Sequence, residues 1–214
     1  MELIAYRCAA WETPFWFDPN PQAGRYNRAG EGPTTYLGLH PLTPWAEYLR
    51  ANGLQTEAEL LSVRPPTWAV RVTLEADEVV ELSFERPDPL CADDLVDDDH
   101  SACQAFATAL RLDPAAPKAI IAPSAALPGT SSLVLLAPRV IAPYLLGPID
   151  PLIDCPAAPT AVRGRGPLNL RPLVRHRGSP VPHPALEAWR TGHTYGFAEP
   201  ELRADELAPS VAGR

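Results

Sequence analysis

Four charged or hydroxyl-bearing side chains lie within apolar or turn-forming stretches of the sequence, where such groups are candidates for a functional role. Arg7 lies in Ile-Ala-Tyr-Arg-Cys-Ala-Ala and Arg25 in Ala-Gly-Arg-Tyr-Asn. Glu47 lies in Pro-Trp-Ala-Glu-Tyr-Leu and Ser124 in Ile-Ile-Ala-Pro-Ser-Ala-Ala. Each alone is an ordinary surface arginine, helix glutamate or turn serine. Because buried charges need partners, the four could instead meet in one cleft, which would offer guanidinium groups, a carboxylate and a hydroxyl to a ligand.

Other catalytic signatures are missing from the sequence. It has no P-loop, no GxGxxG after a strand, no HExxH and no GxSxG. The five histidines have no ligand-like spacing, and Asp97 to Asp99 is more typical of a solvated, self-repelling loop than of a cation site. We therefore expect neither a metal site nor a histidine-based triad.

The candidate residues must be positioned by a mixed set of short elements. Alternating and apolar runs predict strands over 3–8, 34–39, 68–74, 79–84, 118–122 and 132–137. Helices are expected over 43–53, from Thr56 until the prolines at 65 and 66, over 99–112 and over 184–190. Thr43 is expected to cap the first helix and Thr56 to form a capping box with Glu59. The buried face of the helix over 99–112 is expected to carry Ala102, Phe106, Ala109 and Leu110.

Composition sets the broad class of protein. The chain has 214 residues, of which 46% are hydrophobic and 21% charged, so it can bury a sizeable core. It has no membrane-helix run, no signal-peptide pattern and four scattered cysteines, which favours a cytoplasmic protein with reduced thiols. Because nine prolines and six glycines fall in the last 59 residues, we expect one domain over 1–155 and an extension over 156–214 that wraps on it or is partly disordered.

Charge is unevenly distributed along the chain. The net charge of −8 argues against a general nucleic-acid binder, which needs a positive surface. Residues 75–99 hold eleven acidic side chains and one arginine, whereas residues 163–177 hold five arginines and no acid. The two stretches are either solvated surface, or they face each other or a partner of opposite charge.

Taken in order, the motifs resemble a known family. Gly-Arg-Tyr-Asn, then Thr-Thr-Tyr-Leu-Gly-Leu, then Ala-Glu-Tyr-Leu and Ala-Pro-Ser-Ala-Ala, preceded by Tyr6-Arg7, are similar to the motifs of the RES domain. That family is named for an arginine, a glutamate and a serine, which here would be Arg25, Glu47 and Ser124. The resemblance covers roughly residues 3 to 150.

The resemblance implies an α+β fold like that of ADP-ribosyltransferases, with small, twisted, mostly antiparallel sheets and flanking helices. It also implies a toxin of a bacterial toxin–antitoxin pair that consumes NAD by phosphorolysis or hydrolysis. The alternatives are an ADP-ribosyltransferase that modifies a specific protein and a non-catalytic binding module. The implied partner is an Xre-type antitoxin with a helix-turn-helix. The expected assembly is a homodimer or a toxin–antitoxin hetero-oligomer, with no direct contact to nucleic acid and none to a membrane.

Residue roles follow from the same resemblance. Arg7 and Arg25 would hold the NAD diphosphate, with Asn27 also in contact with NAD, and Tyr36 would stack on the nicotinamide ring or its ribose. Glu47 would stabilise the positive charge that develops when the glycosidic bond breaks, and Ser124 would orient the ribose or that glutamate. Nicotinamide leaves from a cationic pyridinium, so this chemistry needs no general acid and one glutamate suffices.

Overall fold

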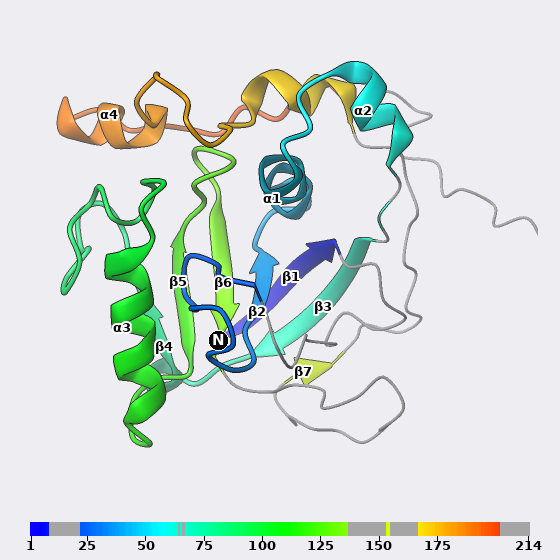
Figure 1. Ribbon diagram of the computed structural model, residues 1–214. Coiled ribbons are helices and arrows are strands. Elements are labelled where there is room, and N and C mark those ends of the chain that lie inside the picture. Colours follow the sequence, from blue (N-terminus) through cyan, green and yellow to red (C-terminus); the bar gives the residue numbers. More distant parts are fainter. Residues whose placement is uncertain (9–21, 64, 66, 137–152, 155–166, 202–214) are drawn as a thin grey trace, which may run out of the picture.

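The computed structural model describes residues 1–8, 22–63, 65, 67–136, 153–154 and 167–201. Within these residues seven strands form one sheet in the order β4-β5-β6-β2-β1-β3-β7 (Figure 1). Neighbouring strands are antiparallel except β4 and β5, which are parallel. The strands are β1 Glu2–Cys8, β2 Thr35–Gly38, β3 Thr67–Thr73, β4 Val79–Glu81, β5 Ala119–Pro123, β6 Ser131–Leu135 and β7 Ile153–Asp154. The expected α+β fold with a mostly antiparallel sheet is confirmed.

The helices are α1 Thr43–Asn52, α2 Glu57–Ser62, α3 Ser101–Leu112 and α4 Pro184–Arg190, with short 3-10 turns η1 Ala76–Glu78 and η2 Leu168–Leu173. In Figure 1, α3 lies beside β4 and β5, whereas α1 sits above the middle of the sheet and contacts β1 and β2. The capping box of Thr56 and Glu59 opens α2 as predicted.

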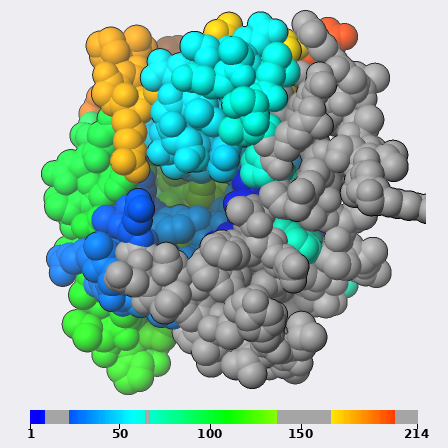
Figure 2. Space-filling model, turned by 45° about the vertical axis from the view of Figure 1, so that its right-hand side comes forward, coloured from blue at the N-terminus to red at the C-terminus, as the bar shows by residue number. Residues whose placement is uncertain are grey.

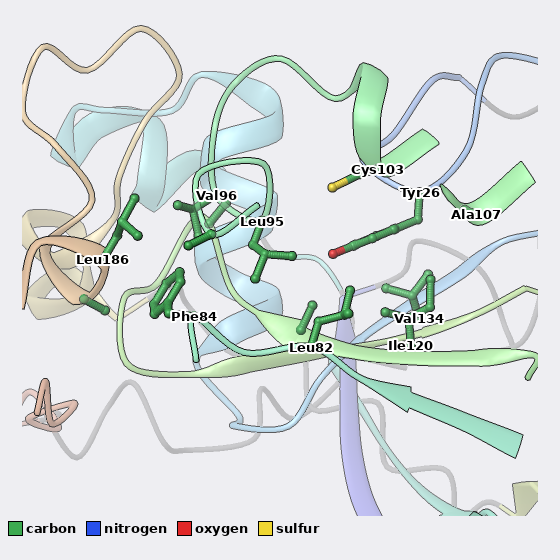
Figure 3. Packing of buried hydrophobic residues seen from close by; sticks show 14 of the residues in the cluster. Tyr26, Leu82, Phe84, Leu95, Val96, Cys103, Ala107, Ile120, Val134 and Leu186 are labelled. Carbon is green, nitrogen blue, oxygen red and sulfur yellow. The ribbon is translucent and has the colours of Figure 1, made fainter. Parts of the chain in front are cut away.

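Alternation along the strands gives the sheet two different faces. On β6, Leu133 and Leu135 join a core cluster with Ala5 of β1 and Val70 of β3. Val134, between them, points to the opposite face and joins a second cluster. Figure 3 shows this second cluster, in which Val134 and Ile120 of the sheet face Cys103 and Ala107 of α3.

Three local predictions are wrong in detail. Thr43 is not the N-cap of α1, because Leu42 holds that position and the Thr43 hydroxyl instead donates to Thr130 Oγ1 at 2.9 Å. Strand β4 ends at Glu81 rather than Phe84, since residues 83 and 86 close a turn through paired backbone hydrogen bonds of 3.2 Å. The fully buried residues of α3 are Cys103 and Ala107. Of the predicted face, Phe106 and Leu110 pack against the same core cluster, whereas Ala109 is exposed.

Residues 167–201, called here the C-terminal segment, pack on the sheet domain. Leu170 and Val174 join a third cluster with Trp45 and Leu49 of α1, and Leu186 of α4 joins the cluster under α3. In Figure 1 this segment runs from α2 across the upper end of β5 and β6 to α4. The described part of the predicted extension therefore wraps on the domain, while the boundary at residue 155 stays a prediction and residues 155–166 and 202–214 lie outside the described part.

Candidate active site

A cavity of about 570 Å³ opens between α1, the loop over residues 22–27 and the face of β2 and β6 that carries Tyr36 and Val134. Figure 2 shows it as a hollow below the cyan α1–α2 region, with the blue loop on one side and the orange C-terminal segment along its edge. Its volume falls in the range of small-molecule sites. Its polar and charged lining includes Arg7, Arg25, Asn27, Tyr36, Glu47, Arg50, His100 and Arg177.

The loop is shaped by a tight turn in which the Gly24 N–H donates to the Asn27 carbonyl at 2.9 Å. Gln104 of α3 donates to the Gly24 carbonyl at 2.8 Å, which ties the turn to the helix. Of the two central residues, Tyr26 is buried in the core under α3, with 2% of its surface exposed, and Arg25 is only partly buried. Tyr26 thus fixes the turn to the core, and Arg25 extends from the same turn to the cavity.

Arg25 is held by backbone carbonyls from the acidic stretch. Its Nη1 donates to the Asp94 carbonyl at 2.9 Å and its Nη2 to the Asp97 carbonyl at 2.6 Å. Neutral acceptors of this kind orient the guanidinium without cancelling its charge. The positive charge of Arg25 therefore remains available to an anion in the cavity.

Tyr36 and Asn27 support the loop from the sheet side. The Tyr36 hydroxyl accepts from the Tyr26 N–H at 2.9 Å and donates to Asn27 Oδ1 at 2.8 Å. Burial raises the pKa of the Tyr36 phenol well above its ordinary value, so it stays protonated. The Asn27 amide nitrogen donates to the carbonyls of Gln22 and Arg28, so every polar atom of this side chain serves the loop itself.

Glu47 projects from α1 and is oriented by Ser124. The Ser124 hydroxyl donates to Glu47 Oε1 at 3.0 Å, and its oxygen accepts the N–H groups of Ala126 at 3.3 Å and Leu127 at 3.1 Å. Ser124 is 1% exposed and does not itself line the cavity. Of the two roles that the resemblance implied for this serine, its contacts favour orienting the glutamate.

Arg7 reaches the cavity from β1, which pairs with β2 at Tyr6 and Gly38. Burial lowers the pKa of its guanidinium to about 10, which leaves it charged at neutral pH. The structure thus brings Arg7, Arg25, Asn27, Tyr36 and Glu47 to the lining of one cavity, and Ser124 hydrogen-bonds the glutamate without lining the cavity itself.

Two further arginines and one histidine that line the cavity were not singled out from the sequence: Arg50, Arg177 and His100. Arg50 sits three residues after Glu47 on α1, a spacing that places both on one helix face and could have identified it. Arg50 as a residue is 5% exposed, and its guanidinium donates to the Arg175 carbonyl at 2.6 Å and to the Asp98 carboxylate. His100 and Arg177 carry no local signal, because they reach the cavity through long-range packing.

The cavity is electropositive in an acidic protein. Among the described lining residues there are four arginines and one carboxylate, Glu47. Burial, reinforced by Arg25 and Arg177, lowers the pKa of His100 to about 4, so this imidazole is neutral at pH 7. In the described part of the chain no cluster of side chains could hold a metal ion, and no helix has the length and apolar character needed to span a membrane. The arrangement suits an anionic organic ligand.

The acidic and basic stretches of the sequence meet beside this cavity. Arg175 approaches Asp98 at 3.9 Å, and the Gly178 N–H donates to the same carboxylate at 2.6 Å. The sequence left open whether the two stretches are solvated, face each other or face a partner. These residues support a direct contact between the two stretches. Arg163 and Arg165 lie outside the described residues.

Comparison with known proteins places the chain in a family. A Mycobacterium tuberculosis protein described as a probable NAD(+) phosphorylase is 36% identical over 123 residues, which make up 55% of this chain and 55% of that protein. The chain thus spans about half the length of this curated relative. The crystal structure of the Mycobacterium tuberculosis MbcT–MbcA toxin–antitoxin complex gives a TM-score of 0.48 at 23% identity, over 63% of this chain and 74% of that chain. Residues 4–150, well over half of the sequence, match the RES domain, and the chain belongs to the RES domain family.

Proposed function

We propose that this protein binds NAD in the cavity and cleaves the bond between nicotinamide and its ribose. The observation that carries the proposal is a single carboxylate among the described lining residues, Glu47, which is held by Ser124 in a cavity that also contains four arginines. Membership of the RES family and the relative described as a probable NAD(+) phosphorylase support it.

Binding would rest on the charge of the cavity. Arg7 and Arg25 would neutralise the diphosphate, because a guanidinium fork matches two phosphate oxygens. The ring of Tyr36, on the cavity wall, would pack against the nicotinamide or its ribose, while its hydroxyl keeps the loop in place. Asn27 would act on NAD through the loop that it holds.

Cleavage would proceed through a transition state with positive charge on the ribose. As the bond from C1″ to the nicotinamide nitrogen breaks, its electron pair leaves with the ring, which becomes neutral nicotinamide. The Glu47 carboxylate would stabilise the charge on the sugar, and its fixed orientation would avoid the cost of reorganising at that moment. An acceptor oxygen then forms the new bond to C1″ and loses its proton to solvent.

We propose phosphate or water as that acceptor, with phosphate favoured by the description of the curated relative. Phosphate yields ADP-ribose 1″-phosphate, and water yields ADP-ribose. An Xre-type antitoxin is proposed as the inhibitor that the family implies, so the protein must be tested free of any partner.

The test is NAD loss, with products identified by mass spectrometry, in buffers with and without phosphate. We expect Glu47→Gln to lower the rate by about 10² to 10³, a loss typical of removing one group that stabilises transition-state charge. Glu57→Gln is the matched control, because Glu57 is an exposed glutamate on the neighbouring helix α2.

Each outcome decides between the candidate functions. NAD loss that disappears in Glu47→Gln and persists in Glu57→Gln supports the proposal, and the product names the acceptor. If the wild-type protein leaves NAD intact in both buffers, cleavage of free NAD is refuted. In that case the protein is incubated with labelled NAD and a cell lysate. Transfer of labelled ADP-ribose to a lysate protein would identify an ADP-ribosyltransferase, and no transfer would indicate a binding module.

A further inference from the structure

We propose that Arg177, supplied by the C-terminal segment, binds a phosphoryl group in the cavity. The ligand chemistry is a phosphate dianion or diphosphate, from NAD itself or from a free phosphate acceptor. The inference deepens the proposed function and rests on it for the identity of the substrate. Arg177 lies beyond residues 4–150, the part of the chain that matches the family.

The backbone on both sides of Arg177 is anchored to the site. Two residues before it, the Arg175 N–H donates to the Ala126 carbonyl at 2.9 Å, and the Arg175 carbonyl accepts from Arg50 at 2.6 Å. One residue after it, the Gly178 N–H donates to Asp98 at 2.6 Å. Gly178 has φ of +70°, a conformation that favours glycine and turns the chain directly after the arginine. These contacts fix where the side chain of Arg177 starts.

The anchors are themselves part of the catalytic region. Ala126 is two residues from Ser124, and Arg50 shares α1 with Glu47. His183, farther along the same segment and 2% exposed, bonds the Ser124 carbonyl at 3.1 Å. The C-terminal segment is therefore attached to the same short stretch that orients the glutamate.

Among the residues that the structure describes, Arg177 has no hydrogen-bond or ion-pair partner, unlike Arg25 and Arg50. Arg25 donates one hydrogen bond from each terminal nitrogen to a backbone carbonyl, and Arg50 is paired with the Asp98 carboxylate. Arg177 is solvent-exposed at the cavity and makes no hydrogen bond or ion pair with any residue that the structure describes. A side chain at the rim of an electropositive cavity, whose donors bond to none of the described residues, is suited to an incoming anion.

The neighbourhood supports an anion rather than a carboxylate partner within the protein. His100, which also lines the cavity, feels the charges of Arg25, Arg177 and Arg50 and that of Asp98. Because Asp98 pairs with Arg50, the charges of Arg25 and Arg177 remain without a carboxylate partner among the described residues at this end of the site. Charges of one sign brought together repel each other, and a bound phosphate would relieve the repulsion.

The test compares Arg177→Gln with Arg171→Gln. Both variants remove one positive charge from an exposed arginine of the C-terminal segment, but Arg171 does not line the cavity. Binding of inorganic pyrophosphate is measured by calorimetry at low ionic strength, and NAD binding is measured in a Glu47→Ala background that prevents turnover. KM for NAD and KM for phosphate are then measured in the active protein. Equal thermal midpoints for both variants and the wild type would verify folding.

We expect Arg177→Gln to weaken pyrophosphate binding about tenfold, the loss expected for one charged hydrogen bond, and Arg171→Gln to leave it within twofold. A rise in KM for NAD alone assigns Arg177 to the diphosphate, and a rise in KM for phosphate alone assigns it to the acceptor. Equal pyrophosphate affinities in the two variants, or no pyrophosphate binding by the wild type, overturn the proposal. If NAD is neither bound nor cleaved but pyrophosphate binding depends on Arg177, the anion site stands and the proposed function fails.

Discussion

Replacing Ser124 by alanine tests whether the glutamate owes its orientation to the turn behind it. The substitution removes one oxygen that is 1% exposed and makes three contacts: to Glu47 Oε1 at 3.0 Å and to the N–H groups of Ala126 and Leu127 at 3.3 and 3.1 Å. It removes a hydroxyl without opening a large cavity. Its effects on catalysis and on stability can therefore be estimated separately.

The catalytic effect comes from the bond to Glu47. A hydrogen bond to a charged group contributes about 1.5–3 kcal/mol, and about 1.4 kcal/mol changes a rate tenfold. We therefore expect kcat for NAD cleavage to fall about 10- to 100-fold, with a smaller change in KM, because Ser124 does not line the cavity. The stability effect comes from the two N–H groups that lose their acceptor. We expect the free energy of unfolding to fall by about 2 kcal/mol, which corresponds to a thermal midpoint lower by about 4–8 °C.

The assay is steady-state NAD cleavage at a temperature where both proteins are folded, with thermal unfolding measured in parallel. Ser132→Ala is the control, since Ser132 lines the cavity and no hydrogen bond of its hydroxyl is found among the described residues. We expect it to retain wild-type activity within about threefold. A Ser124→Ala protein that is folded and cleaves NAD as fast as the Ser132→Ala protein would refute the role given to this hydroxyl.

Two further predictions concern the elements that hold the site. In Gly38→Ala the new Cβ would stand 2.6 Å from Thr43 Cβ and 2.7 Å from Pro44 Cδ, so α1 must move off the sheet. We expect the free energy of unfolding to fall by about 1–3 kcal/mol and NAD cleavage to slow. Gly196→Ala is the control and should behave like the wild type, because its Cβ meets nothing within 4 Å. Burial lowers the pKa of His183 to about 4, so the imidazole stays neutral in the folded protein at pH 7. Because the unfolded chain binds a proton below about pH 6.5, the free energy of unfolding should fall as the pH drops from 6.5 toward 4. The expected loss is on the order of 3 kcal/mol. Denaturant unfolding at pH 7 and pH 4.5 should show a smaller acid loss in His183→Gln, and equal losses in both proteins would contradict this linkage.

Local chemistry made much of the secondary structure predictable. The reciprocal cap of Thr56 and Glu59, and the Pro44 start and Gly53 end of α1, act over three or four residues and are visible in the sequence. Strand alternation likewise placed apolar residues on one face. The cap of α1 was mispredicted because the hydroxyl of Thr43 found a partner 87 residues away, at Thr130, which no local rule contains.

The sequence by itself determined which side chains could do chemistry, through motifs that resemble those of the RES family, and it determined the elements that carry them. Tertiary structure decided which of those groups touch. Glu47 and Ser124 are 77 residues apart and meet because α1 packs against Ala126 and Leu127 in the turn that follows β5. Arg50, His100 and Arg177 joined the cavity the same way, through contacts that depend on strand register and on the C-terminal segment docking beside α1. Such contacts form when apolar surface is buried cooperatively across the whole domain, and that burial is not encoded in any short stretch of residues.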